Sequence, residues 1–138
     1  MGIPTVYHDI VPDMQSAFGD DLSLHVVPAG LAVGTSIRRG DGDCYGFYVI
    51  PQDGGRFSVE DDGATVGMAD ACGAGLVAED GSATSALSRI LDANGVSLDD
   101  LTVTTGPLPA ADVGNGAFRL VSALQDIVAA GNDATPSP

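Results

Sequence analysis

The sequence predicts an α+β fold in which an antiparallel meander comes first and helices pack on one face of the sheet. Residues 22–60 contain consecutive segments of alternating apolar and polar side chains separated by short turns, which is typical of antiparallel strands. Apolar side chains later in the chain recur at helical spacing. Because the strands follow one another without intervening helices, this arrangement is favoured over a parallel α/β fold.

An amphipathic helix over residues 9–18 is predicted before the meander. Its apolar side chains recur at helical spacing, and Pro12 suits a first turn. Two strands follow at residues 22–27 and 31–37, and the sequence Pro28-Ala29-Gly30 turns the chain between them. These elements form the first half of the predicted meander.

Residues 44–50 are the most β-like run of the chain. Their apolar phase consists of Tyr45, Phe47 and Val49. Residues 51–55 have the composition of a hairpin loop, and residues 56–60 return as the next strand. Residues 22–60 therefore complete the predicted meander.

The second half of the chain is predicted to be mostly helical. Helices are expected at residues 64–72, 85–93 and 112–130, and Asn94-Gly95 stops the second of them. A brief strand is expected at residues 101–105. The apolar stripe of the last helix consists of Phe118, Val121, Leu124, Ile127 and Val128. The expected core consists of Phe47, Val49, Phe57, Leu87, Ile90, Leu91, Val121 and Leu124.

Length and composition indicate one domain. A chain of 138 residues that is 44% apolar can build a single core. We therefore assign residues 1–131 to a single α+β domain and residues 132–138 to a flexible C-terminal tail. The N-terminal segment has no signal-peptide pattern, and no apolar run reaches the length of a membrane span. Cys44 and Cys72 lie far apart in apolar contexts, which favours buried thiols of a cytosolic protein over a disulfide.

Charge is the dominant feature of the composition. Nineteen acidic residues, seventeen of them aspartate, accompany five arginines and no lysine, and the net charge is −14. Such a surface repels nucleic acid and anionic membranes, so neither is an expected direct partner. The same charge steers the protein towards a basic protein surface. Acidity also keeps a small protein soluble, and that alternative explains the charge without any partner.

The acidic residues recur at predicted loops, and alternate connections of a meander lie at the same end of a sheet. Several of them can therefore form one anionic face. The predicted partner-binding residues are Asp20, Asp21, Asp41, Asp43, Asp61 and Asp62. A globule of this length has a diameter of about 37 Å, and duplex DNA of that length carries roughly 22 phosphate charges. A net charge of −14 suits a local patch that faces an arginine- or lysine-rich groove rather than imitation of a full duplex.

Signatures of catalysis or metal binding are missing from the sequence. His8 and His25 are the only histidines, and neither accompanies a nucleophile motif. Asp41-Gly42-Asp43 and Asp61-Asp62-Gly63 resemble fragments of calcium loops, but the glutamate that closes an EF-hand loop does not follow. We therefore predict no catalytic residue, no metal site and no cofactor.

Four stretches of the sequence carry a family resemblance. They are Cys44–Val49, Phe57–Gly63, Ile90–Val96 and Phe118–Val121. In this order, the chain from Asp43 to about Val128 resembles a bacterial and phage family known as domain of unknown function 1828. The family's acidic turn usually follows a threonine, and Glu60 stands at that place here. The resemblance implies no established reaction and no active-site residues, whereas the family's occurrence in mobile elements implies a small protein that acts against a host defence.

These observations lead to a hypothesis of a non-enzymatic, acidic phage or prophage protein. It would bind and inhibit a host nucleic-acid-handling defence complex, of the anti-CRISPR or anti-restriction type, through its anionic surface. The expected contact is a basic protein surface such as the nucleic-acid-binding groove of that complex. The alternative is a small regulatory or structural interaction module of a mobile element, whose acidity serves solubility. An enzyme is the third hypothesis.

Overall fold

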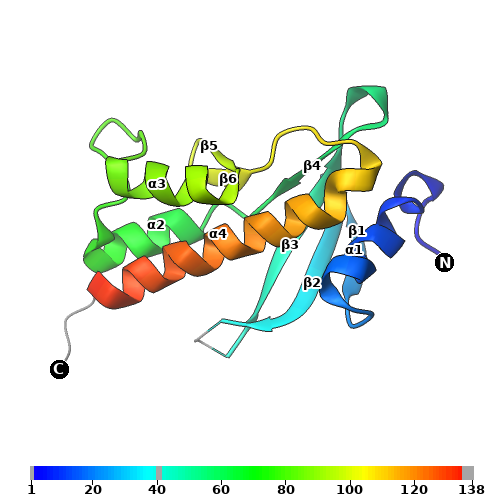
Figure 1. Cartoon of the computed structure of the whole chain (residues 1–138), viewed down its shortest axis with the longest axis horizontal. Coiled ribbons are helices and arrows are strands. Elements are labelled where there is room, and N and C mark those ends of the chain that lie inside the picture. Colours follow the sequence, from blue (N-terminus) through cyan, green and yellow to red (C-terminus); the bar gives the residue numbers. More distant parts are fainter. Residues whose placement is uncertain (1, 40–41, 135–138) are drawn as a thin grey trace.

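A computed structural model describes residues 2–39 and 42–134 of the chain and confirms the predicted α+β fold. Its sheet is antiparallel with the strand order β1-β2-β3-β4-β6-β5. The strands are β1 (Ser23–Val27), β2 (Gly30–Arg38), β3 (Cys44–Pro51), β4 (Phe57–Glu60), β5 (Ser97–Asp99) and β6 (Thr102–Thr104). The helices are α1 (Ile10–Phe18), α2 (Thr65–Ala69), α3 (Ser85–Asn94) and α4 (Val113–Ala134). The helices pack on one face of this sheet (Figure 1).

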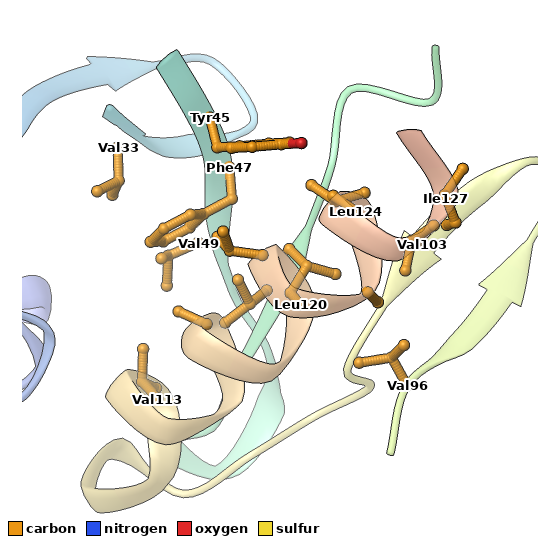
Figure 2. Packing of buried hydrophobic residues seen from close by; sticks show 14 of the residues in the cluster. Val33, Tyr45, Phe47, Val49, Val96, Val103, Val113, Leu120, Leu124 and Ile127 are labelled. Carbon is orange, nitrogen blue, oxygen red and sulfur yellow. The ribbon is translucent and has the colours of Figure 1, made fainter. Parts of the chain in front are cut away.

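The core lies between the sheet and α4, which is the longest helix described. Leu120 and Leu124 of α4 face Phe47 and Val49 of β3, as Figure 2 shows. All expected core residues are buried except Ile90, which is half-buried. The alternating phase of β3 and the helical phase of α3 therefore agree with the expectation from the sequence.

The apolar stripe predicted for α4 is partly wrong, because Phe118 is 51% exposed. The buried side of α4 includes the small residues Gly114, Gly116 and Ala117. Small side chains let α1 approach closely, and the backbone NH of Gly114 donates to Oδ2 of Asp13 at 2.6 Å. The buried face therefore turns towards these small residues and leaves Phe118 at its margin, where its ring packs on Phe18 with centroids 5.9 Å apart.

Both cysteines are exposed, so the expectation of buried thiols is wrong. Cys44 begins β3 in the phase opposite to the buried Tyr45 and Phe47. Cys72 lies beyond α2 in the short helical turn η3 (Asp70–Ala74), which replaces the second half of the helix expected at residues 64–72. The α4 helix continues to Ala134, beyond the expected start of the tail, and residues 135–138 lie outside the described residues.

One strand was not predicted. β5 pairs with β6 through a turn in which Asp100 and Leu101 have φ values of 48° and 70°. Positive φ at both central residues is the geometry that matches the twist of a two-residue hairpin. Asp100 tolerates this conformation, but Leu101 stands where a glycine usually marks such a turn, so the local sequence gives only a weak signal for the hairpin.

Candidate functional site

The antiparallel register brings four acidic connections to the same end of the sheet. These connections precede β1, join β2 to β3, follow β4 and join β5 to β6. We call their exposed carboxylates the acidic end, and it consists of Asp20, Asp21, Asp43, Asp62, Asp99 and Asp100. The predicted contact residue Asp41 lies outside the described residues. The loops are spread along this end, because the ends of β2 and β3 that lead to their connection lie away from β5 and β6 (Figure 1).

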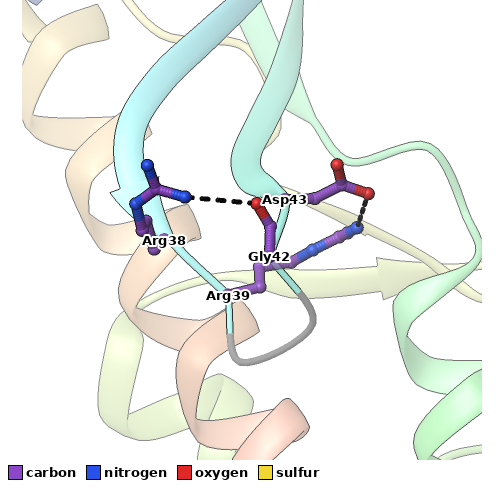
Figure 3. Close-up of polar contacts among 4 residues, drawn as sticks. All are labelled: Arg38, Arg39, Gly42 and Asp43. Atoms are coloured by element: carbon purple, nitrogen blue, oxygen red, sulfur yellow. Dashed lines mark hydrogen bonds and ion pairs between the residues drawn. The ribbon is translucent and has the colours of Figure 1, made fainter.

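The β2–β3 hairpin carries two arginines into the acidic end. Nη2 of Arg39 lies 3.3 Å from Oδ2 of Asp43, and Nη1 of Arg38 donates to the carbonyl of Gly42 at 3.3 Å (Figure 3). The Asp43 side chain remains 79% exposed. An exposed pair of this kind contributes about 0–1 kcal/mol, because water screens both charges. The arginines therefore shape the hairpin, while the Asp43 carboxylate remains accessible to a partner.

Asp62 combines an exposed position with a local structural task. Its Oδ1 accepts a hydrogen bond from the backbone NH of Ala64 at 3.0 Å. An aspartate that bonds the backbone two residues on stabilises a turn, here the one that leads into α2. The carboxylate of Asp62 therefore holds this turn and also adds negative charge to the surface.

Asp61 differs from the expectation, because its side chain is only 4% exposed and is not available as a surface contact. Phe57, Val59 and Asp61 alternate along the chain, so Asp61 continues the side of β4 that faces the core. This period of two was the signal in the sequence that Asp61 is buried. Oδ1 accepts a hydrogen bond of 2.8 Å from the backbone NH of Val103. Oδ2 is buried and has no hydrogen-bond partner among the described residues.

Burial is the main cause that raises the pKa of Asp61 above its ordinary value. The hydrogen bond from the backbone NH of Val103 acts in the opposite direction. The nearby backbone NH of Gly63 and the hydroxyl of Thr65 also lower the pKa. The negative charge of Asp62 raises it further. None of the groups that shift this pKa is a cation.

A cavity of about 290 Å³ lies beside Asp61. β4 pairs with β3 only from Tyr48 to Pro51, so the chain after Glu60 departs from β3 towards β6 and leaves a fork. The cavity extends from Asp61, Asp62 and Thr65 along the neighbouring strands, and its lining also includes His25 of β1, Gly34 of β2, Cys44, Tyr45 and Tyr48 of β3, and Arg39 and Leu124. Sequence analysis identified Asp61 and Asp62 but missed the others, because the fork forms only when distant segments pack together.

A second hollow of about 320 Å³ lies between α2 and the C-terminal part of α4. Its lining includes Met68, Cys72 and Val128 and is mainly apolar. Among the described residues, no group of three or more histidine, cysteine, aspartate or glutamate side chains is arranged to hold a metal ion. None of the helices in residues 2–39 and 42–134 combines the length and the apolar character needed to cross a bilayer.

Fold and site together define a small acidic α+β protein with loop carboxylates at one end of its sheet and a buried carboxylate, Asp61, directly after β4. Residues 35–127 match the family described as Domain of unknown function DUF1828, which confirms the resemblance seen in the sequence. Because the match covers more than half of the chain, the protein belongs to this family. No curated protein and no solved structure gave a significant match to the chain.

Proposed function

We propose that this protein is a non-enzymatic binding module that engages a basic protein surface through its acidic end. Its concrete role would be to inhibit a host nucleic-acid-handling defence complex of the anti-CRISPR or anti-restriction type, in the cytoplasm of a bacterial host. The observation that carries the proposal is the position of Asp20, Asp21, Asp43 and Asp62, which are all exposed and all follow or precede strands at the same end of the sheet.

Electrostatics supports this choice of partner. The net charge of −14 disfavours contact with nucleic acid, whereas a protein groove that binds phosphates carries the complementary charge. Carboxylates such as Asp53, Glu79, Asp92 and Asp133 are exposed elsewhere on the molecule, so the long-range field surrounds the whole protein. The acidic end differs from these positions because its carboxylates stand on connections that adjoin neighbouring strands at the same end of the sheet. It is therefore the place where a localised basic groove would find the most complementary charge.

The position of the charge can be separated from its amount with two matched variants. The first carries Asp20→Asn, Asp21→Asn, Asp43→Asn and Asp62→Asn. The control carries Asp53→Asn, Glu79→Gln, Asp92→Asn and Asp133→Asn, and both variants lose the same number of negative charges. Each is used with the wild type to capture bacterial proteins from lysate, and the captured partner is then measured for association rate at two salt concentrations.

We expect the first variant to associate more slowly than the control and to show a weaker dependence on salt, because steering charges act over about 8–10 Å at physiological ionic strength. If the two variants bind alike, the acidity serves solubility and the acidic end is not the interface. Inhibition is tested separately, by the plating efficiency of phage on cells that carry a CRISPR or restriction system. A wild-type chain that protects no phage on any such host would contradict the inhibitory role.

A further inference from the structure

Asp61, a buried aspartate, lines the cavity of about 290 Å³, and the proposed function assigns this cavity no role. Its Oδ2 has no hydrogen-bond partner among the described residues, although the side chain is only 4% exposed. A carboxylate buried without a counter-charge is costly, and proteins normally pair such a group or leave it protonated. An unpaired acceptor beside a cavity of about 290 Å³ therefore points to a ligand that supplies the missing positive charge.

The surrounding residues limit what this ligand can be. Arg39 also lines the cavity. Its Nη2 lies 3.3 Å from Oδ2 of Asp43, so its guanidinium pairs with the carboxylate of the hairpin. The cavity is at the lower end of the size range of ligand pockets, about 300 Å³, so one long side chain suits it better than a nucleotide. Three aromatic residues of β3, Tyr45, Phe47 and Tyr48, line the cavity together with His25. Aromatic faces attract cations, guanidinium groups above all.

We propose that this cavity receives one arginine side chain of the basic partner. The guanidinium of this arginine donates hydrogen bonds to Oδ2 of Asp61, and the negative charge of Asp62 stabilises it further. The inference rests on the proposed function and adds a specific anchoring contact to it. Acidic loops attract the partner at long range, whereas the buried carboxylate recognises a single inserted cation. Desolvated charge pairs of this kind act mainly on dissociation, so the contact would set how long the complex lasts.

The site can be tested on the isolated full-length protein with N-acetyl-arginine amide as the probe. N-acetyl-citrulline amide is the matched control, because it has nearly the same shape and no charge. Aspartate carboxyl carbons are labelled with carbon-13, and the Asp61 resonance is followed over pH with each compound at constant ionic strength. Calcium chloride at the same ionic strength provides a third arm, which tests for a metal ion as the alternative occupant.

We expect the arginine compound to lower the pKa of Asp61 in a saturable manner, because a cation stabilises the ionised carboxylate. The citrulline compound and calcium should not do so. Asp61→Asn should weaken binding of the arginine compound by about tenfold or more, as read from the backbone NH resonances of Thr65 and Tyr45, whereas Asp62→Asn should weaken it less.

Equal responses to the arginine and citrulline compounds, or a response to calcium alone, would overturn the proposal. A saturable response that Asp61→Asn leaves unchanged would overturn it as well. The probe contains no partner protein, so this result is independent of the capture and kinetic experiments. A failure at the cavity leaves the binding role of the acidic end standing, and a failure of the acidic end leaves the cavity result standing.

Discussion

Asp61 and Val103 are joined by two reciprocal hydrogen bonds. The backbone NH of Asp61 donates to the carbonyl of Val103 at 3.0 Å, and the backbone NH of Val103 donates to Oδ1 of Asp61 at 2.8 Å. Register pairing between β4 and β6 is limited to Glu60 and Thr104. The carboxylate of Asp61 therefore replaces a backbone carbonyl at the point where the chain leaves the sheet for α2, and it ties β4 to the β5–β6 hairpin.

The effect of replacing Asp61 on stability should therefore depend on whether the new side chain can accept the hydrogen bond from the backbone NH of Val103. Asp61→Ala leaves the buried NH of Val103 without a partner and should lower the free energy of unfolding by about 1–3 kcal/mol. Asp61→Asn keeps an oxygen acceptor, so its loss should be clearly smaller. Urea denaturation of the two variants checks the ranking, and an alanine variant as stable as the asparagine variant would show that the hydrogen bond contributes nothing.

The pH dependence of stability should report the raised pKa of Asp61. In the window between the ordinary value of 3.8 and the higher folded value, the folded protein binds more protons than the unfolded chain. The stabilising contribution of this group is fully present below 3.8 and is lost as pH rises through the folded pKa. The free energy of unfolding of the wild type should therefore fall relative to Asp61→Asn as pH rises through this window.

The control for this pH effect is Asp62→Asn, which keeps the Asp61 carboxyl. The free energy of unfolding of Asp62→Asn should fall with pH in the same direction but by less, because the charge of Asp62 is one of the causes that raise the pKa of Asp61. Denaturation curves recorded at several pH values give both differences. A wild-type stability that rises relative to Asp61→Asn over the window would mean that the pKa of Asp61 is lowered in the folded protein.

Two helical glycines should respond in opposite ways to replacement by alanine, because one lies in the contact between α1 and α4 and the other faces open space. A Cβ atom at Gly114 would overlap the backbone carbonyl of Asp13, so Gly114→Ala should cost about 1–3 kcal/mol through forced displacement of α1. A Cβ atom at Gly67 in α2 meets nothing within 4 Å. Gly67→Ala should therefore stabilise the protein by about 0.5–1 kcal/mol. Thermal melting of both variants checks the signs, and a stabilised Gly114→Ala would refute the close packing of the helices.

Two apolar substitutions should differ in cost because of their burial. Leu91 on α3 is 5% exposed, and Leu91→Ala should lower the free energy of unfolding by about 2–5 kcal/mol. Phe118 on α4 is 51% exposed and packs on Phe18. Phe118→Ala should therefore cost no more than about 1.5 kcal/mol. Urea denaturation gives both values. A larger loss for Phe118→Ala would indicate that the ring is buried in the core, as its place in the predicted apolar stripe suggested.

The sequence alone determined the elements whose signal is local. Side chains close together in sequence produce the period of two in residues 44–50 and 57–60 and the helical period in residues 85–94. Strands β3 and β4 and helix α3 could therefore be predicted together with most of their buried residues. Loop aspartates were equally visible, and the exposed positions of Asp20, Asp21, Asp43 and Asp62 agree with the expected acidic loops.

Tertiary structure decided the features that depend on distant segments. Asp61 is buried because it bonds Val103, 42 positions away, and the cavity beside it exists because β4 leaves β3 for β6. Phe118 is exposed because the small residues of α4 turn towards α1, where Asp13 and Gly114 meet across 101 positions. Local patterns give the preference of a side chain for burial, but the depth it reaches is set by the segment that folds against it, and no local pattern carries that information.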